Sequence, residues 1–158
     1  MKTEIERKFI VSGTAYKDLG TYEHCLQGYI PSTNDPLVRI RMIGSKSFLT
    51  MKSNINGLTR LEYEYQIPNQ DAAELIKLFC KDSIVEKNRY IVVYKSTIWE
   101  IDEFLGDNAG LVVAEVELDT EDQFFNKPDW IKEEISTNQK YYNYNLAHHP
   151  YKKWNSIV

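Results

Sequence analysis

The chain has 158 residues, of which 42% are hydrophobic and 27% charged, the balance of an ordinary globular protein rather than a disordered one. Its formal net charge of −4 argues against non-specific binding to nucleic acid or to a membrane surface. No stretch approaches the roughly 18 consecutive apolar residues of a membrane span. The acidic N-terminus is unlike a signal peptide, and Cys25 and Cys80 lie too far apart to indicate a zinc site. We therefore expect one domain over residues 1–158, located in the cytoplasm.

Strand patterns dominate the chain. Apolar and polar residues alternate between turn signals, which predicts strands over residues 3–11, 24–30, 37–43, 47–53, 60–67, 84–95, 97–105 and 111–119. Helices are expected at residues 14–19, 68–81, 120–125 and 137–147. In the second of these, Asp71 and Glu74 have the spacing of a capping box. Eight strands with few helices predict an antiparallel sheet that is closed, or nearly closed, into a barrel.

The polar face of these strands carries charges that are sorted by sign. Side chains alternate between the two faces of a strand, so Glu4, Glu6 and Lys8 share one face. The same spacing recurs in Arg39 and Arg41, Glu62 and Glu64, Lys87 and Arg89, Glu100 and Asp102, and Glu115 and Glu117, with Lys52 in phase on its own strand. A wholly solvated surface has no reason to separate cations from carboxylates strand by strand.

Two arrangements of the barrel are compatible with this pattern. In an ordinary barrel the apolar face fills the interior and the charged face is a solvated exterior. In the other arrangement a wide barrel has a charged, wet interior, and helices partly cover its apolar outside. The apolar face comprises Ile5, Phe9, Val38, Ile40, Leu49, Met51, Tyr63, Tyr65, Trp99, Ile101, Ala114 and Val116. Sorting by sign favours the second arrangement, although buried charges must be paired or solvated.

The charged face has the chemistry of a polyanion site with metal ions. Paired carboxylates supply the hard oxygen ligands that suit Mg²⁺ or Mn²⁺. Arginine binds phosphate oxygens with two donors at once, and lysine contributes a point charge. Six cations are more than a monophosphate needs, but they suit a tripolyphosphate. Phosphoryl transfer depends on positioning and charge neutralisation, and the chain contains no P-loop, GxSxG or HExxH motif.

The segment Glu4-Ile5-Glu6-Arg7-Lys8 resembles the ExExK signature of the CYTH superfamily, the triphosphate tunnel metalloenzymes. The resemblance continues through Gln27-Gly28-Tyr29, Val38-Arg39-Ile40-Arg41, Leu49-Thr50-Met51-Lys52, Leu61-Glu62-Tyr63-Glu64, Glu86-Lys87-Asn88-Arg89, Trp99-Glu100-Ile101-Asp102 and Ala114-Glu115-Val116-Glu117-Leu118. The tail Tyr141-Tyr142-Asn143-Tyr144-Asn145-Leu146-Ala147 resembles that of small bacterial members. The resemblance implies an eight-stranded antiparallel barrel whose tunnel holds a triphosphate, with a divalent metal required for activity.

The resemblance also implies roles for individual residues. The metal ligands would be Glu4, Glu6, Glu115 and Glu117, with Asp102 as a weaker candidate. The phosphate-binding cations would be Lys8, Arg39, Arg41, Lys52, Lys87 and Arg89. Glu62 and Glu64 fit either metal-bound water or the orientation of the arginines. Lys8 and Tyr29 are the catalytic candidates: a phenol among cations would have a lowered pKa and could act as a base, but a tyrosine lining the tunnel mouth fits equally.

The superfamily includes inorganic triphosphatases, thiamine triphosphatases, RNA triphosphatases and class IV adenylate cyclases. The short chain and its tail resemble the bacterial triphosphatases. The sequence therefore predicts Mg²⁺- or Mn²⁺-dependent hydrolysis of tripolyphosphate or a related small-molecule triphosphate. Thiamine triphosphatase, a cyclase that converts ATP to cyclic AMP, and a non-catalytic polyphosphate-binding module are the alternatives. The apolar outer face leaves a homodimer open.

Overall fold

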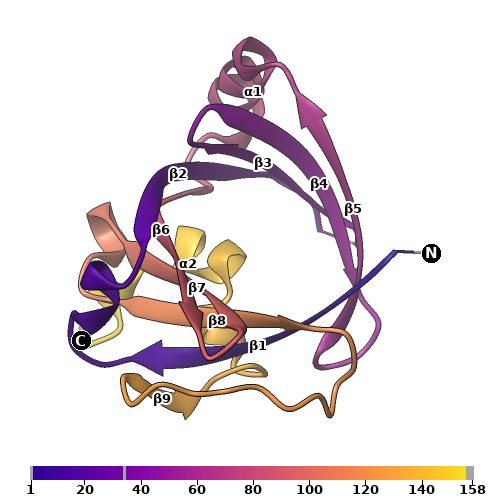
Figure 1. The fold of residues 1–158 in the computed structure, drawn as a ribbon. Helices are drawn as coiled ribbons and strands as arrows, with labels where there is room; N and C mark the ends of the chain where they lie inside the picture. The colour runs from indigo at the N-terminus through magenta and orange to yellow at the C-terminus, as the bar shows by residue number, and fades with distance from the viewer. Residues whose placement is uncertain (1, 34, 156–158) are drawn as a thin grey trace.

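A computed structural model describes residues 2–33 and 35–155 (Figure 1). Its strands are β1 (Thr3–Val11), β2 (Thr21–Ile30), β3 (Leu37–Ile43), β4 (Lys46–Asn54), β5 (Thr59–Ile67), β6 (Ile84–Tyr94), β7 (Thr97–Phe104), β8 (Val112–Leu118) and β9 (Ile131–Glu134). They pair in the order β5-β4-β3-β2-β6-β7-β8-β1-β9, and β1 also pairs with β5. The predicted closed antiparallel barrel of eight strands is therefore confirmed, with β9 added beside β1.

The barrel closes through a short seam between β1 and β5. Among the described residues, the pairs that face each other there are Thr3–Leu61, Glu4–Arg60 and Ile5–Thr59. One further backbone bond, from the Glu62 amide to the Lys2 carbonyl at 3.0 Å, extends the seam. The pairing of β2 with β6, by contrast, runs continuously from Thr21 to Gly28. The seam is thus a narrow junction in an otherwise long hydrogen-bonded wall.

The predicted strands all form, with ends that differ by no more than three residues. The largest difference is at β2, which begins at Thr21 rather than residue 24. The sequence did not reveal β9, because it has four residues of which only Ile131 is buried. Lys95 and Ser96 form a tight hairpin between β6 and β7, with φ values of 46° and 69°.

The helix predicted over residues 68–81 consists of α1 (Asn69–Leu75) followed by one π-helical turn, η2 (Ile76–Cys80). The predicted capping box is wrong, because the helix begins directly after Pro68 and no side chain caps it. Asn69 instead accepts a hydrogen bond from Ser47 Oγ at 2.7 Å and donates one to the Ser45 carbonyl at 3.0 Å. These bonds fasten α1 to the hairpin between β3 and β4.

The remaining helices are short. The prediction at residues 14–19 is confirmed as the 3-10 turn η1 (Ala15–Asp18). The helix predicted at residues 120–125 is wrong, because the chain makes only a turn in which the Asp119 amide donates to Gln123 Oε1. The helix predicted at 137–147 is divided into η4 (Gln139–Tyr141) and α2 (Asn143–His148). Two further 3-10 turns, η3 (Gly106–Asn108) and η5 (Tyr151–Lys153), were not predicted.

The apolar face of the strands points outward and is partly covered. Phe9, Trp99 and Val116 form one cluster with Tyr16 of η1 and Trp130 of the segment before β9. Ile40 is buried beneath α1 and η2, which lie outside the barrel near β3 (Figure 1). Tyr65, in contrast, is 53% exposed. The arrangement with a charged interior is therefore the observed one. Within residues 2–33 and 35–155, no helix is long and apolar enough to span a membrane.

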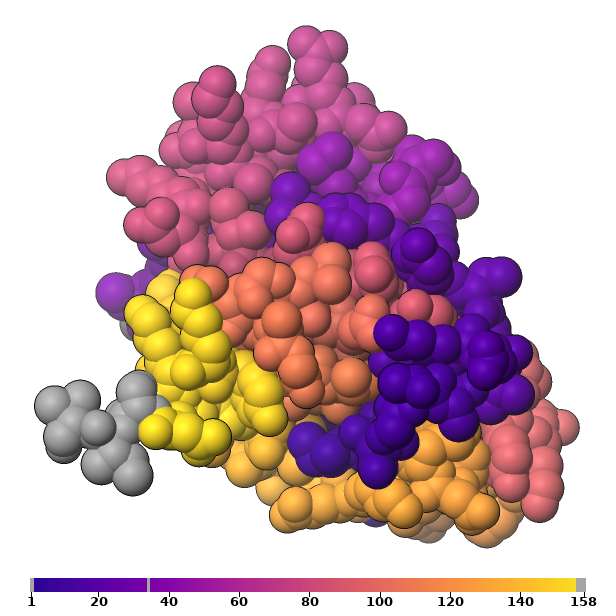
Figure 2. Space-filling model, turned by 90° about the vertical axis from the view of Figure 1, so that its left-hand side faces the viewer, coloured from indigo at the N-terminus to yellow at the C-terminus, as the bar shows by residue number. Residues whose placement is uncertain are grey.

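The interior becomes apolar at the end of the barrel occupied by α2. Val85, Phe104 and Val113 have the same strand phase as the charged residues, and they pack around Leu146 of α2. On the outside, the C-terminal residues (yellow in Figure 2) lie against the segment around η3 (orange). There Asn108 donates to the Leu146 carbonyl at 3.3 Å and accepts from the Tyr151 amide at 2.8 Å. This packing closes one end of the barrel.

Candidate functional site

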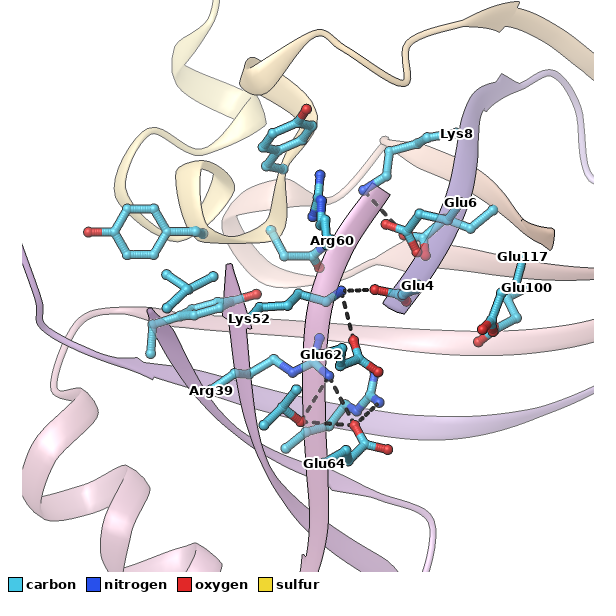
Figure 3. Close-up of a pocket in the computed structure, with 18 of the residues that line it drawn as sticks. Glu4, Glu6, Lys8, Arg39, Lys52, Arg60, Glu62, Glu64, Glu100 and Glu117 are labelled. Atoms are coloured by element: carbon cyan, nitrogen blue, oxygen red, sulfur yellow. Dashed lines mark hydrogen bonds and ion pairs between the residues drawn. The ribbon is translucent and has the colours of Figure 1, made fainter. Parts of the chain in front are cut away.

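The charged face of the strands encloses a cavity of about 270 Å³ inside the barrel. Its lining residues are Glu4, Glu6, Lys8, Tyr29, Leu37, Arg39, Arg41, Thr50, Lys52, Arg60, Glu62, Glu64, Lys87, Arg89, Glu100, Glu115, Glu117, Tyr142, Asn143 and Tyr144. The structure thus brings together every site residue predicted from the sequence except Asp102. Figure 3 shows side chains from opposite strands pointing toward one another across this space.

Glu64 holds the two arginines of β3 in place. Arg39 Nη2 and Arg41 Nη2 donate to Glu64 Oε2 at 3.3 and 3.2 Å, and Thr50 Oγ1 donates to the same oxygen at 2.8 Å. Among the described residues, the Nε atoms of both arginines are buried without a hydrogen-bond partner. Of the two roles predicted for Glu64, the structure places it in contact with the arginines.

The lysines of the cavity are also paired with carboxylates. Lys52 Nζ lies 2.9 Å from Glu4 Oε2 and 3.2 Å from Glu62 Oε2. Lys8 Nζ lies 3.2 Å from Glu115 Oε1. Burial works to lower the pKa of Lys8 and of Lys52, but the surrounding carboxylates outweigh burial and raise both pKa values. Both lysines are therefore cationic at neutral pH.

Asp102 is a partner of the cations rather than a lining residue. Its side chain is 1% exposed; it accepts bonds from Lys87 Nζ at 2.7 Å and from Arg89 Nε and Nη2, each at 2.8 Å. Burial alone would raise the pKa of Asp102, but Arg89 and Lys87 lower it. The prediction of Asp102 as a metal ligand is not favoured by this geometry, because both of its oxygens already face cations.

Four carboxylates, Glu4, Glu6, Glu100 and Glu117, form what we call the acidic group. Glu6 and Glu117 lie directly opposite each other on β1 and β8, where like charges repel. Burial, followed by the Glu115 carboxylate, raises the pKa of Glu6 to about 7. Burial and the neighbouring carboxylates Glu4 and Glu100 raise the pKa of Glu117. Burial likewise raises the pKa of Glu100, although Arg89 opposes it. Negative charge is therefore in excess here.

The acidic group suits a divalent cation. Glu4 Oε2 is buried and accepts no hydrogen bond in the described structure, since its contact with Lys52 lacks hydrogen-bond geometry. Over residues 2–33 and 35–155, no group of three or more acidic, histidine or cysteine side chains is arranged to hold a metal ion by itself. Mg²⁺ does not require such a group, because it usually binds through one or two carboxylates, several waters and the phosphates of a substrate. The residues present fit a metal that arrives with a phosphate ligand.

Glu115 differs from its neighbours in the acidic group. Burial alone would raise the pKa of Glu115, but Lys8, Arg89 and Lys87 hold it well below its ordinary value. Its Oε2 lies 3.9 Å from Arg89 Nη2, and its other oxygen contacts Lys8. Glu115 is therefore an ionised carboxylate that links two cations of the cavity.

The expected lowering of the Tyr29 pKa is wrong. Tyr29 is 3% exposed, and burial raises its pKa despite the opposing effects of Arg39 and Lys52. Its hydroxyl accepts a hydrogen bond from Gln27 Nε2 at 2.8 Å, and its ring meets Tyr144 edge-on with centroids 5.5 Å apart. A neutral phenol is a poor base, which favours the second of the two predicted roles, that of a tyrosine lining the cavity.

Several lining residues were not predicted from the sequence. Arg60 is in strand phase with Glu62 and Glu64, so alternation was an available signal for it, and Glu100 was placed on the charged face but given no role. Asn143, which accepts from Lys87 Nζ at 3.0 Å, had no such signal. Its position depends on the packing of α2 into the end of the barrel.

Comparison with known proteins agrees with this fold. The family model described as the CYTH domain matches residues 2–149. An inorganic triphosphatase of Acetivibrio thermocellus is 47% identical over 154 residues, covering 98% of this chain and 99% of that protein. An inorganic triphosphatase of Nitrosomonas europaea is 36% identical, covering 92% and 97%. A crystal structure of the inorganic triphosphatase NE1496 has a TM-score of 0.65 and 34% identity, covering 93% of this chain and 95% of that chain. The chain belongs to the CYTH domain family.

Proposed function

We propose that the protein hydrolyses tripolyphosphate, or a closely related inorganic triphosphate, with Mg²⁺ or Mn²⁺ as its cofactor. The observation that carries this proposal is the cavity itself, in which buried cations on several strands face the acidic group. Two relatives that match this chain over more than nine-tenths of its length are named inorganic triphosphatases. The same ligand would neutralise both halves of the cavity, its phosphates meeting the cations and its metal the carboxylates.

In this proposal the chain's own residues bind, orient and exclude water. Lys8, Arg39, Arg41, Lys52, Lys87 and Arg89 bind phosphate oxygens. Glu64 and Asp102 orient the guanidinium groups, and Glu62 contacts Lys52. Glu4, Glu6 and Glu117 hold the metal, with Glu100 and Glu115 beside them. When bound, the metal supplies charge neutralisation and makes a water molecule more acidic. Because Tyr29 is neutral, a carboxylate of the acidic group is the better candidate to orient that water.

The closed end of the barrel limits how a substituted triphosphate could bind. Leu146 and the apolar residues around it fill the interior beyond the charged region. A thiamine or adenosine group would therefore have to extend through the opposite end. A module that only binds polyphosphate would have no need of a group of mutually repelling carboxylates. The cytoplasmic location, the single domain over residues 1–158 and the homodimer stay predictions from composition and pattern.

The test combines a substrate panel with one variant. Metal-free protein is supplied with Mg²⁺, Mn²⁺ or no metal and offered tripolyphosphate, thiamine triphosphate or ATP, while phosphate and cyclic AMP are measured separately. We expect phosphate release from tripolyphosphate, dependent on metal. Glu6→Gln keeps the shape of the side chain but removes its charge, so turnover should collapse while the protein remains folded.

The matched control is Glu133→Gln, an exposed carboxylate outside the cavity, which should retain wild-type turnover. Release of cyclic AMP as the main product would replace the proposed function with that of a cyclase. Near-normal activity of Glu6→Gln at submillimolar Mg²⁺ would remove the metal-ligand assignment.

A further inference from the structure

Arg60 differs from the other cations of the cavity because no carboxylate of the described residues forms an ion pair with it. Within the described parts of the chain, no carboxylate oxygen lies within 4.0 Å of its guanidinium group. The other lining cations each have such a partner, as Lys8 has Glu115 and Arg39 has Glu64. Arg60 Nε is in addition buried without a hydrogen-bond partner among the described residues. A cation in this position loses hydration without gaining an anion, unless a ligand supplies one.

Strand register places Arg60 at the end of a line of cations on one wall. Arg39 of β3 faces Thr50 of β4, which in turn faces Glu64 of β5. Two residues further along β4, Lys52 faces Glu62. Two residues further again, Asn54 faces Arg60. Each step is therefore two residues along the strands, or about 7 Å. We call the residues Arg41, Arg39, Lys52 and Arg60 the cation row. Figure 3 shows Arg60 between Lys52 and Lys8.

Tyr142 holds the Arg60 side chain without using its hydrogen-bond donors. The guanidinium carbon lies 4.7 Å from the centroid of the Tyr142 ring, and Lys8 Nζ lies 5.6 Å from the same centroid. The Tyr142 hydroxyl donates to the Ser136 carbonyl at 3.1 Å, and Ser136 Oγ accepts from the Lys8 amide at 3.0 Å. A cation over an aromatic face is stabilised electrostatically while its N–H groups stay available. The ring is thus fixed to the backbone beside β1.

We propose that Arg60 is a further phosphate-binding residue, which takes the free terminal phosphate of the substrate at the α2 end of the cavity, and that Tyr142 positions it. This inference rests on the proposed function. Because α2 closes that end, the group that reaches Arg60 has to be a phosphate without a substituent. The site therefore selects linear triphosphates with at least one unsubstituted end. A chain esterified at both ends does not fit.

The experiment measures KM and kcat for tripolyphosphate in Arg60→Ala, Arg60→Lys, Tyr142→Leu and the double variant Arg60→Ala/Tyr142→Leu. We expect Arg60→Ala to raise KM about tenfold to a hundredfold, the range of one charge-assisted hydrogen bond, with a smaller change in kcat. Arg60→Lys keeps the charge but loses the forked donors, so its KM should lie between those of Arg60→Ala and wild type. Lys46→Ala removes an exposed cation outside the cavity and serves as the control.

The role of Tyr142 is tested by the double variant. If Tyr142 acts by positioning Arg60, Tyr142→Leu should raise KM in the wild-type background and add little to Arg60→Ala, whereas a structural role predicts additive losses. A wild-type KM in Arg60→Ala or in Arg60→Lys overturns the inference about Arg60. The proposed function fails separately, if the wild-type protein releases no phosphate from tripolyphosphate with any metal.

Discussion

At the scale of single residues, Glu6 is the carboxylate with the most consequential protonation. Its pKa is raised from 4.5 to about 7, first by burial and then by Glu115. A carboxylate whose pKa is higher in the folded than in the unfolded protein stabilises the fold below the unfolded pKa. That contribution is lost as the pH rises through the folded pKa. The ligand-free protein should therefore lose the contribution of Glu6 between about pH 4.5 and about pH 7.

Replacing Glu6 by glutamine removes this titration. Other groups, such as Glu115 with its lowered pKa, titrate in the opposite sense, so the informative quantity is a difference between two proteins. The Tm of Glu6→Gln minus that of wild type, measured in a chelator, should rise from about pH 5 to about pH 8. A flat difference for Glu6→Gln would mean that its carboxylate is not destabilised by its surroundings.

Most lining residues could be predicted because alternation along a strand is a local property. Arg39 and Arg41 share a face whatever their neighbours are. The properties of Tyr29 and Asp102 are different, because they depend on other strands. Burial decides the pKa of Tyr29, and the register of β6 against β7 places Arg89 opposite Asp102. Neither the burial of Tyr29 nor the pairing of Asp102 with Arg89 can be predicted from the residues that flank Tyr29 and Asp102 in the sequence.

At the scale of secondary-structure elements, β2 and η2 pack so closely that only glycine fits between them. A Cβ atom on Gly28 would lie 2.7 Å from Cys80 Cβ and 2.8 Å from Cys80 Sγ. Gly28 precedes Tyr29, so the same contact fixes the strand that carries a cavity residue. Gly28→Ala should force β2 and η2 apart and destabilise the protein by about 1–3 kcal/mol, the usual cost of overpacking.

Thermal or denaturant unfolding of Gly28→Ala measures this cost. Gly57→Ala is the control, because the nearest atom to its added Cβ, Thr137 Cγ2, lies at an ordinary 3.4 Å. Equal stability of Gly28→Ala and wild type would show that η2 can move away from β2 without loss.

Helices were harder to predict than strands because their ends are determined by tertiary contacts. Residues 137–147 have a continuous helical pattern, yet Tyr142 is extended, with φ −69° and ψ 137°, and separates η4 from α2. Its ring lies between Lys8 and Arg60, and its hydroxyl bonds the Ser136 carbonyl. These contacts favour a break in the helix, and the two with Lys8 and Arg60 come from β1 and β5, far away in the sequence.

At the scale of the whole molecule, the barrel gathers cations from several strands around one cavity, where the phosphates of a single ligand could contact them together. Tripolyphosphate that binds only the folded protein raises its stability by mass action, by about 2.7 kcal/mol at a hundredfold excess over Kd. For a chain of this length that corresponds to a rise in Tm of roughly 5–10 °C. Calcium is a suitable metal for the measurement, since it binds carboxylates with a more flexible geometry. We expect a much smaller shift with monophosphate.

The double variant Arg39→Ala/Arg41→Ala provides the control, because it removes half of the cation row while leaving the acidic group intact. Its shift with tripolyphosphate should vanish. Equal stabilisation by monophosphate and tripolyphosphate would mean that the cations act as separate sites.

The short seam between β1 and β5 gives the barrel a weak line along its length. With three facing pairs among the described residues, it has fewer than any other pairing within the eight-stranded barrel, so local opening of the barrel should begin there. Glu4 stands on one side of this line, and Arg60 and Glu62 stand on the other. A metal triphosphate that is bound by residues on both sides would hold this seam closed. Binding of the metal triphosphate and closure of the barrel at this seam would then be the same event.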